Sequence, residues 1–336
     1  MTDAPASAPR HRVVLGAADD PAVAPTPMPS GAIAVLPDGD ASVDAAVRDA
    51  GGAVRPLGSS ARGIVWTGAS GAEELGSVLE RHPDVTWVQL PWAGVDAFAP
   101  LLERFRGDGR VWTSAKGAYA QPVAEHALML ALALLRELPR RVEASAWNAD
   151  ERGRSLYGAE VVIIGAGGIA VELLRLLDPF GVRATVVRRR PAPVPGAYRT
   201  VATSGLGDAL ERAEVVFVAA ALTNESRGLV GAGEFARMPP GTVLVNVARG
   251  GLVDTGALVE ALLSGRMGGA GLDVTDPEPL PEGHPLWSAP NCIITPHVAD
   301  TDSMTVPLFA ERVRRNVRAF LGDGAFEGRI DLDAGY

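Results

Sequence analysis

Three side chains that could carry out acid–base chemistry on a carboxylate substrate follow three apolar segments in the second half of the chain. They are Arg249, Glu278 and His297, and the segments before them span residues 243–247, 269–273 and 292–295. The carboxyl ends of parallel strands meet at one edge of a sheet, where ligands bind. A histidine there can protonate a ketone oxygen, a carboxylate can keep the imidazole charged, and an arginine can hold a substrate carboxylate with two hydrogen bonds.

A glycine-rich turn lies between an apolar segment, residues 161–164, and a segment with helical spacing, residues 171–177. The turn consists of Gly165, Ala166, Gly167, Gly168, Ile169 and Ala170. In the pattern G-x-G-x-x-A the first glycine permits a tight turn, the second lets a pyrophosphate approach the backbone, and the small third residue lets helix and strand pack closely. The N–H groups at the start of the helix then hold the phosphates. The pattern predicts dinucleotide binding.

The next apolar segment, residues 184–187, ends in Arg188, Arg189 and Arg190. An acidic residue about 20 residues beyond the glycine turn usually binds the ribose 2′-hydroxyl of NAD. Guanidinium groups instead bind a 2′-phosphate through charge-assisted hydrogen bonds. The three arginines therefore favour NADP(H) over NAD(H). The alternative is a solvated run in a chain that has 31 basic residues, of which only Lys116 is a lysine.

The composition excludes several classes of protein. The chain has 336 residues, 47% of them hydrophobic, which is enough for about two globular domains. Its net charge of −9 disfavours nucleic-acid binding, and the single cysteine, Cys292, excludes an intramolecular disulfide and a multi-cysteine metal site. The longest apolar stretch, residues 127–135, is too short to cross a membrane. We expect a cytoplasmic protein with no signal peptide, no metal and neither membrane nor nucleic acid as partner.

Two series of short apolar segments alternate with segments of helical length, as in parallel βαβ units. The first series predicts strands at 32–36, 53–57, 63–66, 85–89 and 110–113, with helices at 42–50 and 72–81. The second predicts a buried helix at 123–138, strands at 161–164, 184–187, 214–218, 243–247, 269–273 and 292–295, and a final helix at 305–321. The fold class is therefore α/β, with two doubly wound parallel-sheet domains.

With these motifs in this order, the chain resembles the D-isomer-specific 2-hydroxyacid dehydrogenase family. The matching motifs lie at 89–95, 117–126, 165–170, 246–254, 271–279 and 295–299, within about residues 60–320. The resemblance implies a Rossmann cofactor domain, residues 113–298, inserted in a flavodoxin-like substrate domain, residues 1–112 plus 299–336. It also implies a catalytic cleft between the two domains, with hinges near 112 and 299.

The same resemblance assigns roles to individual residues. Arg249 would bind the substrate carboxylate and carbonyl, His297 would be the acid/base, and Glu278 would pair with His297 and keep it protonated. Asp273 would contact the nicotinamide carboxamide. The backbone N–H groups of the turn formed by Ala93, Gly94 and Val95 would bind the substrate carboxylate. Two further residues, Thr223 and Ala248, would line the cofactor site.

Three further residues have open interpretations. Lys116 would approach the nicotinamide and could attract a second anionic group of the substrate, or it could be an exposed lysine without a role. Trp92 precedes the carboxylate-binding turn and could shape the substrate pocket. Trp147 follows the long helix, in a region that forms an arm over the partner subunit in family dimers, and we expect a homodimer. His126 and His284 are interpreted as packing or capping residues.

The sequence thus predicts an NADP(H)-dependent D-2-hydroxyacid dehydrogenase that acts as a 2-keto-acid reductase on a small 2-keto or 2-hydroxy acid. Hydride would pass from C4 of the nicotinamide to the keto carbon while His297 protonates the oxygen. Glyoxylate and hydroxypyruvate are the first substrates to consider for a short member that uses NADPH. The alternative is a dinucleotide-sensing partner of a transcription regulator with the same fold, and a catalytically idle binding module is a third reading.

Overall fold

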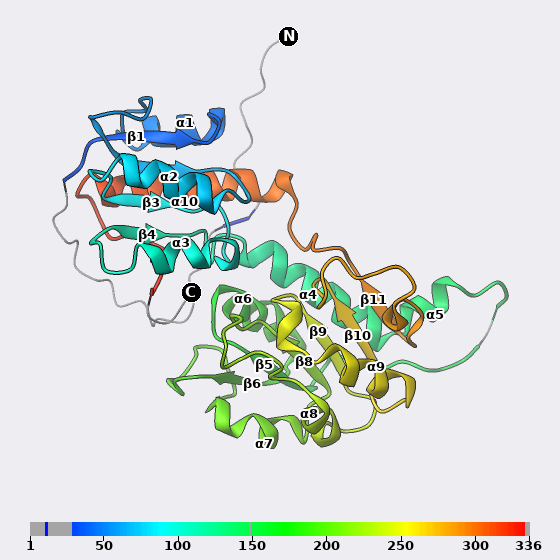
Figure 1. The fold of residues 1–336 in the computed structure, drawn as a ribbon. Coiled ribbons are helices and arrows are strands. Elements are labelled where there is room, and N and C mark those ends of the chain that lie inside the picture. Colours follow the sequence, from blue (N-terminus) through cyan, green and yellow to red (C-terminus); the bar gives the residue numbers. More distant parts are fainter. Residues whose placement is uncertain (1–10, 13–28, 148, 333–336) are drawn as a thin grey trace, which may run out of the picture. The chain divides into compact units, whose positions relative to one another are not determined.

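The computed structural model describes residues 11–12, 29–147 and 149–332, which form two compact units (Figure 1). The first unit contains the described residues up to Tyr119 together with those from Thr301 onward. The second contains Ala120–Asp300 and is therefore inserted in the sequence of the first. Among the described residues, no helix is long and apolar enough to cross a membrane.

The first unit is built on a parallel sheet whose order is β1-β2-β3-β4. These strands are β1 (Ala32–Leu36), β2 (Ala61–Trp66), β3 (Trp87–Gln89) and β4 (Val111–Thr113). The predicted strand at 53–57 is wrong, because only one parallel bridge, from Val54 to Ile33, joins this segment to β1. Pro56 has no N–H group for a ladder, so pairing ends there. If residues 53–57 are counted as an edge strand beside β1, the five segments, numbered in chain order, have the flavodoxin-like order 2-1-3-4-5.

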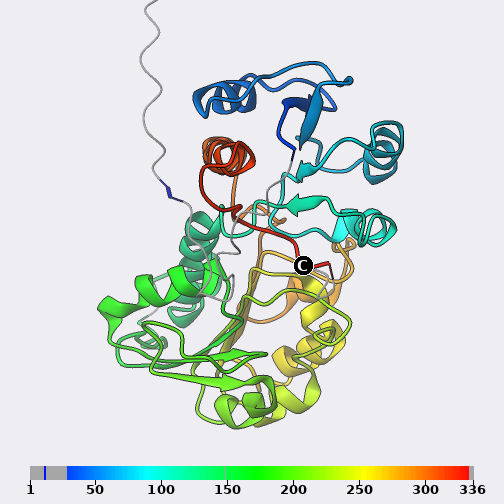
Figure 2. The same cartoon turned by 90° about the vertical axis from the view of Figure 1, so that its left-hand side faces the viewer.

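Helices cover both faces of this sheet (Figure 2). One face carries α1 (Ala41–Asp49) and α10 (Asp302–Phe320), and the other carries α2 (Ala72–Arg81) and α3 (Ala99–Arg104), which follows the short 3-10 helix η1 (Asp96–Phe98). The C-terminal helix begins earlier than the apolar pattern predicts, at Asp302. Pro307 consequently lies in its second turn, where it removes one intrahelical hydrogen bond.

The second unit is built on a seven-stranded parallel sheet with the order β11-β10-β9-β8-β5-β6-β7. Its strands are β5 (Glu160–Ile164), β6 (Arg183–Arg188), β7 (Arg199–Ala202), β8 (Val215–Val218), β9 (Val243–Asn246), β10 (Gly269–Leu272) and β11 (Cys292–Ile294). The chain turns back beside β5, which is the switch point where doubly wound sheets bind ligands. The sequence pattern does not predict β7, because this edge strand is short, half-exposed and only partly apolar.

Helices cover both faces of the larger sheet as well (Figure 2). On one face lie α4 (Ala120–Leu135) and α6 (Gly168–Leu177), and on the other lie α7 (Leu206–Leu210), α8 (Ala232–Arg237) and α9 (Thr255–Leu263). The single helix expected at 123–138 is wrong at its end. Glu137 has a positive φ of 48°, which ends the α4 segment and starts the separate α5 (Leu138–Val142). The remaining elements are the 3-10 helices η2 (Asp178–Phe180), η3 (Thr203–Gly205), η4 (Gly250–Leu252) and η5 (Pro285–Ser288).

Candidate active site

The glycine turn joins β5 to α6 and is shaped by two glycines with different tasks. Gly165 has a φ of +114°, and a Cβ atom there would lie 2.3 Å from the carbonyl oxygen of Ala219 at the end of β8. Only glycine fits that conformation and that close approach. Gly167 caps α6, and a Cβ atom on it would meet nothing within 4 Å. The backbone of the turn is therefore open on the side of Gly167, where a phosphate could approach the start of a ten-residue helix.

The three arginines lie beside this turn. The N–H group of Gly165 donates to the carbonyl oxygen of Val187 over 2.8 Å, so the residues after Val187 begin next to the glycine turn. Arg188 is half-buried and donates from Nη1 to the carbonyl oxygen of Ala192, whereas Arg189 and Arg190 are exposed. The structure thus brings the predicted phosphate-binding turn and the arginine segment to the same place on the sheet edge.

Arg249 is held by a buried asparagine at the end of β9. The side chain of Asn246 donates to the carbonyl oxygen of Arg249 over 2.9 Å and accepts from the N–H group of Ala248 over 3.1 Å. The guanidinium of Arg249 donates to the carbonyl oxygen of Ala248 over 2.7 Å. Asn246 fixes the turn that carries the arginine, a role that its position in the sequence does not reveal.

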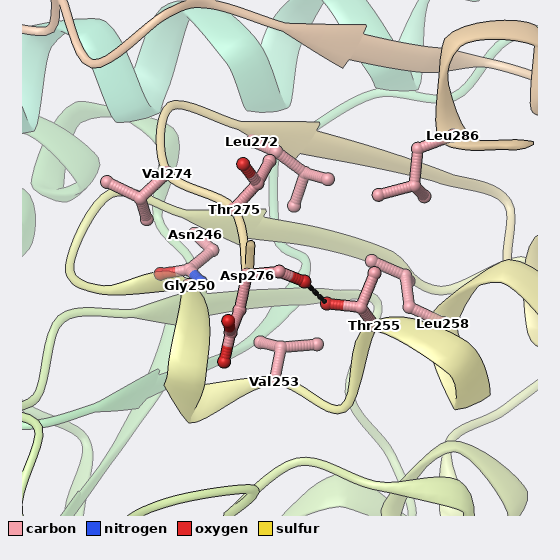
Figure 3. Close-up of a pocket in the computed structure, with 10 residues that line it drawn as sticks. All are labelled: Asn246, Gly250, Val253, Thr255, Leu258, Leu272, Val274, Thr275, Asp276 and Leu286. Atoms are coloured by element: carbon pink, nitrogen blue, oxygen red, sulfur yellow. Dashed lines mark hydrogen bonds between the residues drawn. The ribbon is translucent and has the colours of Figure 1, made fainter. Parts of the chain in front are cut away.

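A close backbone contact joins the Arg249 loop to the loop that carries Glu278. A Cβ atom on Gly250 would lie 1.9 Å from the carbonyl oxygen of Thr275, so only glycine permits this approach. In Figure 3 the two loops also meet where the hydroxyl of Thr255 donates to the carbonyl oxygen of Asp276 over 2.7 Å. The narrow pocket drawn there is walled by Val253, Leu258, Leu272 and Leu286 among others. The contact keeps the predicted arginine and carboxylate on neighbouring loops.

Glu278 and His297 form a direct pair. Oε1 of Glu278 lies 2.7 Å from Nδ1 of His297, and both side chains are partly open to solvent, at 40% and 48% of their surface. Pro277 and Pro279 flank Glu278 and restrict its backbone. Because Nδ1 faces the carboxylate, Nε2 is the nitrogen that can exchange a proton with a substrate oxygen.

The backbone that presents His297 has an unusual conformation. His297 has a φ of +54°, a value rare for residues with a side chain, and its N–H group donates to the carbonyl oxygen of Asp273 over 2.8 Å. The carboxylate of Asp273 is 2% exposed. It accepts hydrogen bonds from the Thr295 hydroxyl over 2.6 Å, from Val298 N–H over 2.9 Å and from Ala299 N–H over 3.1 Å. Asp273, the residue expected to contact the cofactor, thus also holds the loop of residues 295–299 that carries His297.

His126 also belongs to this network, although it is 169 residues away from its partner in sequence. Its Nε2 atom lies 2.9 Å from the hydroxyl oxygen of Thr295 and 3.6 Å from Oδ1 of Asp273. The sequence interpretation of His126 as a packing or capping residue missed this contact. The one local signal was that His126 follows Glu125 as the second of two titratable residues in a mostly apolar helix. His284, by contrast, does cap the 3-10 helix η5 by accepting from Leu286 N–H.

Two ionisable groups near these loops have shifted pKa values. Burial raises the pKa of Asp300, against an opposing effect of His297 and a reinforcing effect of Asp273. Burial raises the pKa of the Cys292 thiol to about 12, so this cysteine is not a candidate nucleophile. Thr223 lies in a turn after β8, where its hydroxyl and N–H group both contact the hydroxyl of Ser226.

The remaining predicted residues belong to the first unit. Ala93, Gly94 and Val95 form a turn beyond the end of β3. Trp92 contacts Tyr119 edge to face, and its carbonyl oxygen accepts from the N–H group of Ala115. The carbonyl oxygen of Lys116 accepts from the buried guanidinium of Arg312 over 2.8 Å. Their roles in substrate binding stay predictions.

Comparison with known proteins places these features in a family. Residues 126–299 match the family described as D-isomer specific 2-hydroxyacid dehydrogenase, NAD binding domain. A human protein named glyoxylate reductase/hydroxypyruvate reductase is 35% identical over 254 residues, which are 71% of this chain and 77% of that one.

Solved structures show the same fold over nearly the whole chain. A D-isomer specific 2-hydroxyacid dehydrogenase from Xanthobacter autotrophicus, in complex with NADPH and MES, superposes with a TM-score of 0.75 at 28% identity, covering 92% of this chain and 100% of that one. An NADPH-dependent glyoxylate/hydroxypyruvate reductase from Sinorhizobium meliloti, in complex with NADP and sulfate, gives 0.73 at 26% identity, with coverage of 92% and 100%.

Proposed function

The chain belongs to the D-isomer specific 2-hydroxyacid dehydrogenase family, and we therefore propose that it reduces a small 2-keto acid to the D-2-hydroxy acid with NADPH. As a member, it is an NAD(P)-dependent oxidoreductase that acts on the CH–OH group of 2-hydroxy acids. The observation that carries the proposed reaction is the 2.7 Å contact between Glu278 and His297. That pair lies on the same sheet edge as the glycine turn.

His297 serves as the proton donor in this proposal. Its Nδ1–H group donates to the Glu278 carboxylate, which stabilises the charged imidazolium and fixes the ring orientation. Nε2–H then gives its proton to the keto oxygen as the keto carbon is reduced. In the reverse direction, the neutral imidazole removes the hydroxyl proton at Nε2.

Arg249 binds the substrate carboxylate and polarises the carbonyl. A guanidinium offers parallel N–H groups that match a carboxylate, and the contact of Gly250 with Thr275 keeps its loop against the one that carries Glu278. Asn246 holds the backbone of that loop from the end of β9. The arginine therefore orients the keto acid, while the histidine handles the proton.

The residues of the glycine turn fit a nicotinamide dinucleotide. Gly167 leaves open the space that a Cβ atom would fill, and the first N–H groups of α6 suit a pyrophosphate. When bound, the cofactor supplies the hydride. Oδ2 of Asp273 accepts one hydrogen bond, from Ala299, and a carboxylate oxygen can accept a second, which suits the nicotinamide carboxamide. Thr223 and Ala248 complete the proposed cofactor contacts.

Preference for NADP(H) is supported by Arg188, Arg189 and Arg190 at the end of β6, beside the glycine turn. A carboxylate at this place would repel a 2′-phosphate, whereas guanidinium groups attract it. The structures of two relatives contain NADPH and NADP, respectively, which supports the same cofactor here. Glyoxylate and hydroxypyruvate are the first substrates to test, because the human and Sinorhizobium relatives are named for them.

A homodimer is part of the proposal. Large apolar side chains are exposed along α4, α5 and the segment after them, at Met129, Leu138, Val142 and Trp147, and Trp147 is 99% exposed. Exposed apolar groups that gather on one region mark interaction surfaces. Sedimentation velocity of the wild type and of Trp147→Ser with Val142→Ser would show a dimer weakened by the substitutions. A monomeric wild type would contradict this part.

The test of the proposed function is a steady-state assay that follows NADPH and NADH oxidation in parallel. The panel contains glyoxylate, hydroxypyruvate, pyruvate, phenylpyruvate and a dicarboxylate analogue. We expect turnover of at least one short keto acid, with a higher kcat/KM for NADPH. Preference for NADH would contradict only the proposed role of the arginines and would leave the proposed reductase activity standing. Tight NADPH binding without turnover of any keto acid would contradict the reductase.

A further inference from the structure

We propose that His126 is a positioning residue for the acid/base His297, acting through Thr295 and Asp273. This inference rests on the proposed function, because it assigns His297 the proton transfer. The three residues come from different elements of the second unit. His126 lies on α4, Thr295 follows β11, and Asp273 follows β10. None of them needs to contact the substrate to serve in this way.

The hydrogen bonds of this network have only one consistent direction. The Thr295 hydroxyl has a single proton, and the 2.6 Å contact with Oδ1 of Asp273 takes it, because a carboxylate can only accept. The oxygen of Thr295 must therefore accept from Nε2 of His126, 2.9 Å away. It follows that Nε2 of His126 carries a proton. The chain of donors runs from His126 to Thr295 to Asp273.

Asp273 accepts four hydrogen bonds from residues 295–299, the histidine loop. Its carbonyl oxygen accepts from His297 N–H, and its carboxylate accepts from the Thr295 hydroxyl and from the N–H groups of Val298 and Ala299. Thr295 precedes His297, whereas Val298 and Ala299 follow it, so the carboxylate is hydrogen-bonded to the loop on both sides of His297. A single buried residue, Asp273, therefore holds the histidine loop in place.

The conformation of His297 explains why such support is needed. A φ of +54° is unfavourable for a residue with a Cβ atom and persists only when the surroundings enforce it. The imidazole must at the same time keep Nδ1 2.7 Å from Oε1 of Glu278, which lies on another loop. His126 contributes by holding the Thr295 hydroxyl, and hence the Asp273 carboxylate, in one orientation. Loss of its donor would loosen the turn and misplace Nε2 of His297.

Matched variants separate the hydrogen bond from packing. Thr295→Val keeps the shape of threonine without its hydroxyl, and Thr295→Ser keeps the hydroxyl. His126→Leu removes the donor, whereas His126→Gln retains a donor near the place of Nε2. His82→Gln, in the other unit, controls for a histidine-to-amide change away from the network.

We expect Thr295→Val and His126→Leu to lower kcat by about tenfold or more, because proton transfer is misaligned. KM for NADPH should change by a smaller factor, because Asp273 keeps its hydrogen bonds from Val298 and Ala299. Thr295→Ser and His126→Gln should recover most of the loss. The solvent deuterium isotope effect on kcat should rise in the two impaired variants. A loss of folded protein would lower the rate without moving that isotope effect. Unchanged kcat in Thr295→Val and His126→Leu would overturn the proposal.

A second measurement needs neither substrate nor cofactor. Long-range 1H–15N spectra of protein labelled with 15N-histidine report which ring nitrogen carries a proton, and His126→Gln identifies the His126 signals by their disappearance. We expect protonated Nε2 in the wild type and a mixture of ring forms in Thr295→Val. An unprotonated Nε2 in the wild type would overturn the proposal. A wild type that reduces no keto acid would instead contradict the proposed function, while the spectra would still decide the direction of the hydrogen bonds.

Discussion

Nδ1 of His297 lies 2.7 Å from Oε1 of Glu278, although the two residues follow different strands and His297 adopts a left-handed backbone. The contact assigns the two ring nitrogens different tasks, with Nδ1 held by the carboxylate and Nε2 left for a substrate. The same geometry determines which substitution of His297 is informative. Asparagine tolerates the left-handed region better than most residues, so it can replace histidine with little change in the backbone.

His297→Asn should therefore lower kcat by about 10² to 10⁴-fold, the usual contribution of a general acid, while leaving the protein folded. The affinity for NADPH, measured by fluorescence titration, should stay within about twofold of the wild type, because asparagine replaces no group of the glycine turn. Thermal unfolding serves as the control for folding. Retention of most of the wild-type kcat would contradict the role of His297 as proton donor.

Substitution of the two glycines of the phosphate-binding turn by alanine should affect different properties, stability at Gly165 and cofactor affinity at Gly167. Gly165→Ala should destabilise the protein by about 3 kcal/mol or more, because the residue has a positive φ and its Cβ atom would lie 2.3 Å from Ala219 O. Gly167→Ala should leave stability within about 1 kcal/mol but raise the Kd for NADPH by about tenfold, because its methyl group fills the open space. Urea unfolding and cofactor titration of both variants measure the contrast. Equal effects on stability would contradict it.

Gly250→Ala tests the contact between the two loops that carry Arg249 and Glu278. Its Cβ atom would lie 1.9 Å from Thr275 O, so the loops must separate, and we expect kcat/KM to fall by about 10²-fold. Gly233→Ala is the matched control, since a Cβ atom there would meet nothing within 4 Å inside α8. It should stabilise the protein by about 0.5 kcal/mol and leave turnover unchanged. Normal activity of Gly250→Ala would show that the contact does not position the arginine.

Double substitution of Arg188→Ala and Arg189→Ala should lower kcat/KM for NADPH by about tenfold and leave the value for NADH within about twofold, because only NADPH has a 2′-phosphate. Arg199→Ala provides the control, since this exposed arginine lies on the edge strand β7. Steady-state kinetics with both cofactors at a fixed keto-acid concentration measure the ratio. If the ratio does not change, the arginine segment is simply solvated.

Asp300→Asn should stabilise the protein at pH 7 and have little effect near pH 3. Burial raises the pKa of Asp300, so the native state binds its proton more tightly than the unfolded state. Stability from this group is therefore present below the unfolded pKa of about 3.9 and is lost as pH rises through the higher native pKa. Urea unfolding at both pH values measures the difference, with the exposed Asp323→Asn as control. An equal gain at both pH values would contradict this linkage.

The strand pattern of the larger unit was predictable because its inner strands are buried on both faces and hence uniformly apolar. Six of its segments form strands within a residue or so of the predicted ends. The prediction failed where burial is partial, at the edge strand β7, and where a proline interrupts an edge segment, at 53–57. The helix predicted at 123–138 begins and ends three residues earlier, at Ala120 and Leu135, and the sequence pattern does not register the left-handed Glu137 that separates it from α5.

By itself, the sequence determined the α/β class, the family, the glycine turn and the residue types that end each strand. Parallel topology explains this reach, since it brings the carboxyl ends of apolar strands to one edge wherever they occur in the chain. Only the tertiary structure decided which side chains touch. His126 and Thr295 are 169 residues apart, the close approach of Gly250 to Thr275 joins loops after different strands, and the Asp273 carboxylate faces the histidine loop. Such contacts depend on side-chain directions and backbone angles, which no periodicity encodes.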